Sequence, residues 1–199
     1  MVNPDKIFGR LSNRMFLMAA WYTHAKDNNI PFFAQDEKYF EKYKDEIKAL
    51  YSDGITPNGV DAVGIHVRRA KNPINPEEPA YSENGFYADL GHHLHEDMSD
   101  NYYVRAMAMF PGEKFIVFSD DPDWCEKQAI FEGCTIARGN EIEDMNNLAS
   151  CMGIIGANSS FSWWAAYLSS AVKIVFPKRW FANEENESLI GLPKHWLRI

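Results

Sequence analysis

Residues 60–69 read VDAVGIHVRR, and this stretch decides the fold that we predict for the chain. Valine and isoleucine alternate at positions 63, 65 and 67, which is typical of a strand with one face in a core. The opposite face carries Gly64, His66 and Arg68, and the stretch ends at Arg69. We therefore predict a buried strand with two arginines at its carboxyl end.

Downstream of this strand, short apolar segments alternate with helical patterns. We predict further strands over residues 114–119, 134–137, 152–157 and 173–176. Helices are predicted over residues 101–110, 122–131, 143–150 and 161–170. This alternation favours an α/β fold, in which a Rossmann-type parallel sheet has helices on both faces.

Upstream, the pattern is different and shorter. We predict a largely buried helix over residues 13–29, a short strand over 31–34 and an exposed amphipathic helix over 36–51. The turn-rich stretch SDGITPNG at 52–59 follows them, which is typical of a boundary. We therefore divide the chain into an amino-terminal unit, residues 1–59, and a larger unit, residues 60–199.

The composition excludes several classes of function. The chain has 20 Lys and Arg against 28 Asp and Glu, a formal net charge of -8, which argues against a nucleic-acid partner. The 3 cysteines lack metal-site spacing and favour a reducing compartment. No apolar run is long enough for a transmembrane segment, and no leader pattern follows Met1. We therefore expect a cytoplasmic protein.

The end of the strand at 60–69 is the first candidate for a site, because sheets of this kind bind ligands at the carboxyl ends of their strands. Period two places His66 and Arg68 on one side of the strand and Arg69 on the other. The planar guanidinium fork of arginine suits phosphate oxygens. The alternative is that both arginines make surface ion pairs.

The second candidate is the stretch FSDDP at 118–122. Asp121 before Pro122 is a typical helix N-cap with proline at the first helical position. This leaves Asp120 as a free carboxylate, which could accept two hydrogen bonds from the N1 and N2 groups of guanine. The alternatives are a second turn-capping aspartate and a metal-binding acidic pair.

The third candidate is the stretch NSSFSWW at 158–164, between a predicted strand and a predicted helix. A helix N-terminus attracts anions, and serine hydroxyls add donors. The alternative is an ordinary serine cap with tryptophans in the core. Together the three strand ends suit a nucleoside diphosphate without a metal ion, because arginine and a helix dipole can stabilise a leaving diphosphate.

Taken in order, these motifs resemble those of the α-1,2-fucosyltransferases, which are glycosyltransferases of the family 11 type. The stretches that carry the resemblance are GRLSNRMF at 9–16, HVRR at 66–69, FSDD at 118–121, Trp124, EDM at 143–145, NSSFSWWAAYL at 158–168, Pro177 and Trp180. The run from 158 is the most specific of them.

The resemblance implies a GT-B-like fold of two facing Rossmann-like units, here with an abbreviated acceptor-side unit at residues 1–59. It implies GDP-fucose as the donor substrate, no separate cofactor, and metal-independent inversion at the anomeric carbon. A glycan hydroxyl would be the acceptor. The motifs indicate neither the identity of that glycan nor the oligomeric state.

The resemblance also implies roles for single residues. Arg68 would hold the β-phosphate and act in catalysis by stabilising the departing GDP, His66 would lie near the nucleoside, and Asp120 would read the guanine. The implied donor-binding set is Asn13, His66, Arg68, Asp120, Asn158, Ser160, Phe161 and Ser162, with Ser160, Phe161 and Ser162 lining the diphosphate. The general base is left unassigned.

The chain departs from the family pattern at two places. Arg10 and Ser12 replace two glycines of the first loop, and Lys71 stands near the position of an expected carboxylate. These changes leave an alternative open, namely a catalytically eroded protein that binds a nucleotide sugar or a glycan on the same scaffold. Transfer or hydrolysis of fucose would separate the two hypotheses.

Overall fold

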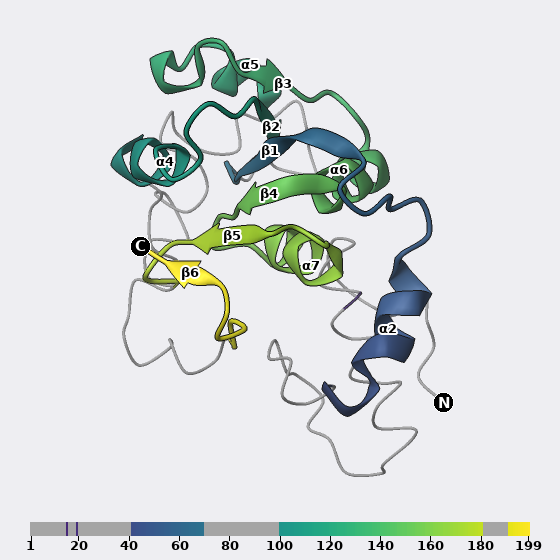
Figure 1. Cartoon of the computed structure of the whole chain (residues 1–199). Coiled ribbons are helices and arrows are strands. Elements are labelled where there is room, and N and C mark those ends of the chain that lie inside the picture. The colour runs from purple at the N-terminus through teal and green to yellow at the C-terminus, as the bar shows by residue number, and fades with distance from the viewer. Residues whose placement is uncertain (1–14, 16–18, 20–40, 70–99, 181–190) are drawn as a thin grey trace.

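One parallel sheet forms the centre of the protein. A computed structural model of the chain describes residues 15, 19, 41–69, 100–180 and 191–199 (Figure 1). Within these residues the strands are β1 (Val60–Val67), β2 (Phe115–Ser119), β3 (Thr135–Ile136), β4 (Cys151–Ile155), β5 (Lys173–Phe176) and β6 (Leu197–Arg198). They run in the order β3-β2-β1-β4-β5-β6, and every neighbouring pair is parallel.

This strand order is that of the doubly wound Rossmann sheet. The predicted α/β fold with a parallel sheet is therefore confirmed, and it is consistent with the GT-B-like fold that the resemblance implies. The edge strand β6 is absent from the sequence prediction. It pairs through Val175 with Leu197 and through Phe176 with Arg198, and two residues are too few for a periodic pattern to show.

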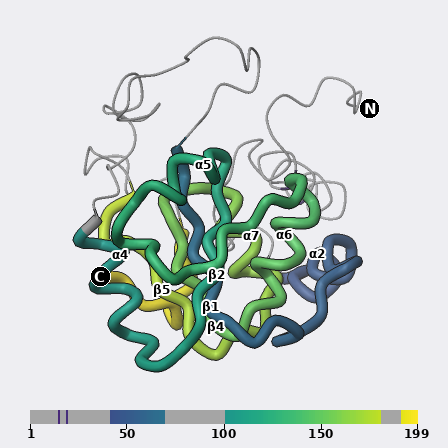
Figure 2. The backbone as a smooth tube through the Cα atoms, turned by 90° about the horizontal axis from the view of Figure 1, so that it is seen from above, coloured from purple at the N-terminus to yellow at the C-terminus, as the bar shows by residue number. Residues whose placement is uncertain are grey.

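Helices cover both faces of the sheet, as Figures 1 and 2 show. They are α2 (Lys44–Tyr51), α4 (Asp100–Met107), α5 (Pro122–Cys125), α6 (Glu141–Ala149) and α7 (Ser160–Leu168), with short 3-10 helices at Glu41–Tyr43 and Ala129–Phe131. The start of α6 is a capping box, in which the Asn140 side chain accepts from backbone N–H groups and the Glu143 carboxylate accepts from the Asn140 N–H. None of the helices described is long and apolar enough to cross a membrane.

The predicted helix over 122–131 is shorter than expected. It ends at Cys125, and the following N–H groups of Lys127 and Gln128 bond to carbonyls only three residues back, at 3.1 Å. Gln128 then takes an extended conformation before the short helix at Ala129–Phe131. The extended residue interrupts the ladder, which a periodicity argument does not detect.

The two faces of the sheet have separate cores. One contains the buried side chains of α6 and α7, with Trp163, Trp164 and Leu148 at its centre. The other contains Tyr102 and Tyr103 of α4 together with the valine and isoleucine side chains at positions 63, 65 and 67 of β1. The alternation predicted at positions 63, 65 and 67 is thus confirmed, because these three side chains share one core, whereas Val60 at the start of β1 packs on the other.

The amino-terminal part that is described packs on the core of α6 and α7. Ile47 of α2 is fully buried there, and Tyr51 contacts Trp164 edge to face, with ring centroids 5.4 Å apart. The predicted strand at 31–34 and most of the predicted helix at 13–29 lie outside the described residues. The division of the chain at residue 59 stays a prediction.

The strand order creates a switch point between β1 and β4. The next described helix after β1 is α4, on one face, whereas β4 leads directly into α7 on the other face. Sheets of this type bind ligands outside the carboxyl ends of the two strands at such a point. The site is therefore to be sought among the residues that follow β1, β2 and β4.

Candidate functional site

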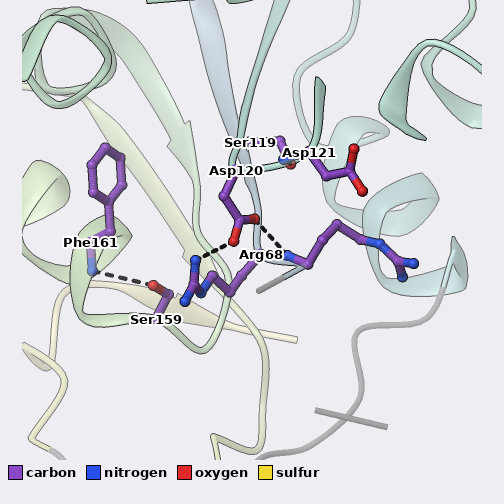
Figure 3. Close-up of polar contacts among 7 residues, drawn as sticks. Arg68, Ser119, Asp120, Asp121, Ser159 and Phe161 are labelled. Atoms are coloured by element: carbon purple, nitrogen blue, oxygen red, sulfur yellow. Dashed lines mark hydrogen bonds and ion pairs between the residues drawn. The ribbon is translucent and has the colours of Figure 1, made fainter. Parts of the chain in front are cut away.

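The carboxyl ends of three neighbouring strands bring the predicted site residues together. β1 ends at Val67, whose partner in β2 is Ser119, and Ile65 of β1 is paired with Ile155 of β4. Because the strands are parallel and in register, the residues that follow them meet at one edge of the sheet (Figure 3). Arg68, Asp120 and the loop before α7 all lie there.

Asp120 contacts both arginines. Its Oδ2 forms an ion pair with Nη1 of Arg68, and its Oδ1 accepts a hydrogen bond from the backbone N–H of Arg69 at 2.8 Å (Figure 3). The side chains of Arg68 and Asp120 retain 17% and 11% of their exposure. The expectation of a free Asp120 carboxylate was therefore wrong, because β1 and β2 are neighbours and their ends adjoin.

Arg69 lies on the other face from His66. Its guanidinium carbon is 3.9 Å from the centre of the Trp124 ring of α5, which packs on the α4 core. A planar guanidinium on an aromatic face is a favourable cation–π contact. The alternation predicted for the strand end thus places the Arg69 side chain on the α5 side, away from α7.

His66 spans the switch point. Its ring is buried and stacks on Phe161 of α7, with centroids 5.0 Å apart and an interplanar angle of 27°. The contact joins the end of β1 to the first turn of the helix that follows β4. Both residues belong to the predicted donor-binding set, and the structure brings them together.

Two members of the predicted set hold the loop before α7 in place. The hydroxyl of Ser162 is fully buried, accepts from the Ala157 N–H at 3.1 Å and lies 2.9 Å from the Ala157 carbonyl. The buried Asn158 side chain donates to the Trp180 carbonyl at 3.1 Å. These contacts give Ser162 and Asn158 a structural role in shaping the loop.

Ser159 caps α7, since its hydroxyl accepts from the Phe161 N–H at 3.3 Å (Figure 3). The sequence did not distinguish this cap from the other serines of the stretch, Ser160 and Ser162. Ser160 and Phe161 are partly exposed at the helix start. They are therefore the members of the predicted diphosphate lining that remain accessible, and their role there stays a prediction, as does that of Asn13, which lies outside the described residues.

Asp121 is a helix cap, as predicted, because its Oδ1 accepts from the Trp124 N–H at 3.3 Å. With Asp120 on the arginines and Asp121 on the helix, the two carboxylates have different partners. In the part of the chain that the structure describes, no three His, Cys, Asp or Glu residues gather as metal ligands would. Metal independence itself stays a prediction.

Asp144, in the stretch EDM at 143–145, is a buried carboxylate outside the predicted donor-binding set. Its side chain is 9% exposed and shares the buried face of α6 with Met145 and Leu148. Desolvation raises the pKa of Asp144 and Glu143 adds to the rise, while a hydrogen bond from the Gly139 backbone opposes it. A carboxylate on the apolar face of an amphipathic helix is the signal that could have marked it as a candidate functional residue.

Replacing Asp144 with asparagine is expected to raise the melting temperature at pH 7. A raised native pKa means that the ionised carboxylate costs stability, fully above the native pKa and not at all below the unfolded value of about 3.9. The advantage of asparagine should therefore shrink as the pH falls through the native pKa. Thermal melts from pH 7 down to pH ~3.5 would test this.

The exposed Asp61→Asn provides the control for that experiment, because its carboxylate lies on the surface of β1. Its melting temperature should stay close to that of the unmodified protein throughout. A lower melting temperature of Asp144→Asn at pH 7 would show that partners stabilise the ionised form, contrary to our interpretation.

The fold and the residues at the switch point define the class of protein. The chain is a Rossmann-type α/β protein whose switch point carries an arginine and the start of a helix, both of which suit an anion. Within that class it belongs to glycosyl transferase family 11, whose family model matches residues 11–196. The resemblance inferred from the motifs is thereby confirmed.

Individual relatives are consistent with this membership. An alpha-1,2-colitosyltransferase of Escherichia coli is 30% identical over 84% of this chain and 61% of its own length. The O-antigen biosynthesis glycosyltransferase WbnK of Escherichia coli is 27% identical over 82% of this chain and 53% of its own. The galactoside 2-alpha-L-fucosyltransferase Sec1 of Mus musculus is 24% identical over 75% of this chain and 39% of its own. The chain thus spans less than two thirds of the length of each of these relatives.

Proposed function

We propose that the protein is a glycosyltransferase that moves L-fucose from GDP-fucose to a hydroxyl group of a glycan, with inversion and without a metal ion. The observation that carries the proposal is the position of Arg68 at the end of β1, next to β4, where His66 of the same strand end stacks on the first turn of α7. Membership of glycosyl transferase family 11 and the fucosyltransferase named among its relatives support it.

Departure of GDP from the sugar places negative charge on the β-phosphate. A fixed cation and a helix N-terminus stabilise such charge without having to reorganise during the reaction. Arg68 retains part of its exposure at the sheet edge, and α7 has no acidic residue in its first turn to oppose an anion. Arg68 is therefore the residue to which we assign stabilisation of the leaving group. The general base stays unassigned.

Colitose is a second candidate for the transferred sugar. The relative with 30% identity is named an alpha-1,2-colitosyltransferase, so colitose is the second sugar to test. Supplying the protein with GDP-fucose and with a colitose donor, each with a panel of glycans, would decide between them. Absence of transfer and hydrolysis with both donors, despite nucleotide binding, would favour the eroded binding protein instead.

GDP should bind at least about tenfold more tightly than UDP or ADP, a difference of roughly 1.4 kcal/mol. The family assignment, with GDP-fucose as the donor that the resemblance implies, motivates this expectation. Calorimetry with the three diphosphates would measure it. Equal affinity for all three would remove the guanine-nucleotide assignment, and binding of none would remove the proposed function.

Transfer and GDP binding should both survive EDTA. The reason is that the cationic group beside Asp120 is an arginine, with Arg68 on one carboxylate oxygen and the Arg69 backbone on the other. Initial rates would be compared with and without the chelator, and with added Mg²⁺ or Mn²⁺. Strict dependence on either ion would revive the metal-binding interpretation of Asp120 and Asp121.

A further inference from the structure

Asp120 links two consecutive residues of the strand end through different atoms. One oxygen pairs with the side-chain tip of Arg68, and the other accepts from the main-chain N–H of Arg69. Arg68 is thus held at both ends of its long side chain, because the backbone beside it and the guanidinium bind the same carboxylate. A freely rotating arginine would lose this conformational freedom on binding a ligand, whereas a held one has lost it already.

The backbone next to Asp120 is fixed by further hydrogen bonds. It follows β2, and the next residue, Asp121, donates its N–H to the Ser119 hydroxyl at 3.0 Å and caps α5 with its side chain. Trp124 of α5 in turn packs on the Arg69 guanidinium. The end of β1, the end of β2 and the start of α5 therefore form one connected scaffold that holds Asp120 against the Arg68 guanidinium.

We infer that Asp120 is a positioning residue, which acts on the donor through Arg68 by aiming the guanidinium at the β-phosphate. The inference rests on the proposed function, and it replaces the expectation that Asp120 reads the guanine base. The carboxylate faces arginine donors on both oxygens, and this contact orients a cation. The role assigned to Asp120 is therefore independent of the base of the nucleotide.

Asp120→Asn separates the two roles, because asparagine keeps the shape but loses the charge that orients Arg68. Calorimetry would compare GDP, UDP and GMP on the unmodified protein and on the variant. The affinities for GDP and UDP should both fall by about tenfold or more, the factor for one charge-assisted hydrogen bond. The affinity for GMP, which lacks the β-phosphate, should stay unchanged. A merely structural defect would weaken all three.

Two results would overturn the inference. If the variant bound GDP and GMP more weakly but UDP as tightly as the unmodified protein, Asp120 would read guanine. Tighter binding of GDP and UDP by the variant would mean that Asp120 only competes with phosphate for Arg68. Failure of the unmodified protein to bind GDP would instead contradict the proposed function, so the two failures are distinguishable.

A second variant covers the case in which Asp120→Asn does not fold. Asp120→Glu keeps the charge but displaces the carboxylate by one methylene. It should therefore lower the affinities for both GDP and UDP, and by a smaller factor than Asp120→Asn. A double-mutant cycle adds a further check. If Asp120 acts through the Arg68 guanidinium, Asp120→Asn should change the GDP affinity little in an Arg68→Lys background. Full additivity would contradict the positioning role.

Discussion

Replacing Arg68 with lysine is expected to weaken GDP binding by about tenfold or more, whereas the same change at Arg69 should leave the affinity nearly unaltered. Lysine keeps the charge but loses the planar fork that contacts Asp120 and suits a phosphate. A charge-assisted hydrogen bond of this kind contributes about 1.5–3 kcal/mol. At Arg69 the contact with Asp120 comes from the backbone N–H, which lysine retains.

Calorimetry with GDP on both variants would measure the difference, and thermal melts would show whether each is folded. Arg69→Lys should melt at a lower temperature than the unmodified protein, because an ammonium group cannot stack flat on the Trp124 ring as the guanidinium does. If instead Arg69→Lys lost GDP binding and Arg68→Lys kept it, the phosphate contact would be wrongly assigned to Arg68.

The strands were the most predictable part of the fold. β5 has the bounds predicted for it, Lys173–Phe176, and β1 ends two residues earlier than predicted, at Val67. In both, β-branched side chains alternate or cluster over a length that suits a strand, and burial of one or both faces reinforces the pattern. Local sequence is therefore enough to predict where the strands lie and which of their side chains are buried.

The order of the strands is not local information. Arg68 and Asp120 are 52 residues apart in the sequence, and they meet because β2 lies directly beside β1. The sequence indicated that each residue follows a strand, but not which strand ends adjoin. For this reason Asp120 was predicted to be free, whereas the fold pairs it with arginines.

The loop before α7 illustrates a second limit. The pattern NSSFSWW indicated a helix start with several hydroxyl groups, and α7 does begin at Ser160. It did not indicate which hydroxyls turn inward. Ser162 lies in the first turn on the side that packs against the chain at Ala157, so its hydroxyl bonds there and is removed from the surface.

Replacing Gly156 with alanine is expected to destabilise the protein by about 1–3 kcal/mol, the usual cost of overpacking a core. A Cβ at this position would lie 2.4 Å from Cζ of Phe176. The Phe176 ring is fully buried and stacks on Trp196, with centroids 5.0 Å apart, so it has no open space into which it could turn. The backbone would have to move instead.

That movement would reach the site, because Gly156 joins β4 to the loop before α7 and its carbonyl accepts from the Tyr102 hydroxyl at 2.6 Å. Thermal melts should show a fall on the order of 5 °C, given ~2–4 °C per kcal/mol for a chain of this size. Phe176→Leu supplies the control, since it removes the ring that the new methyl group would meet. Gly156→Ala should cost clearly less in that background, and an equal cost in both would place the strain elsewhere than at Phe176.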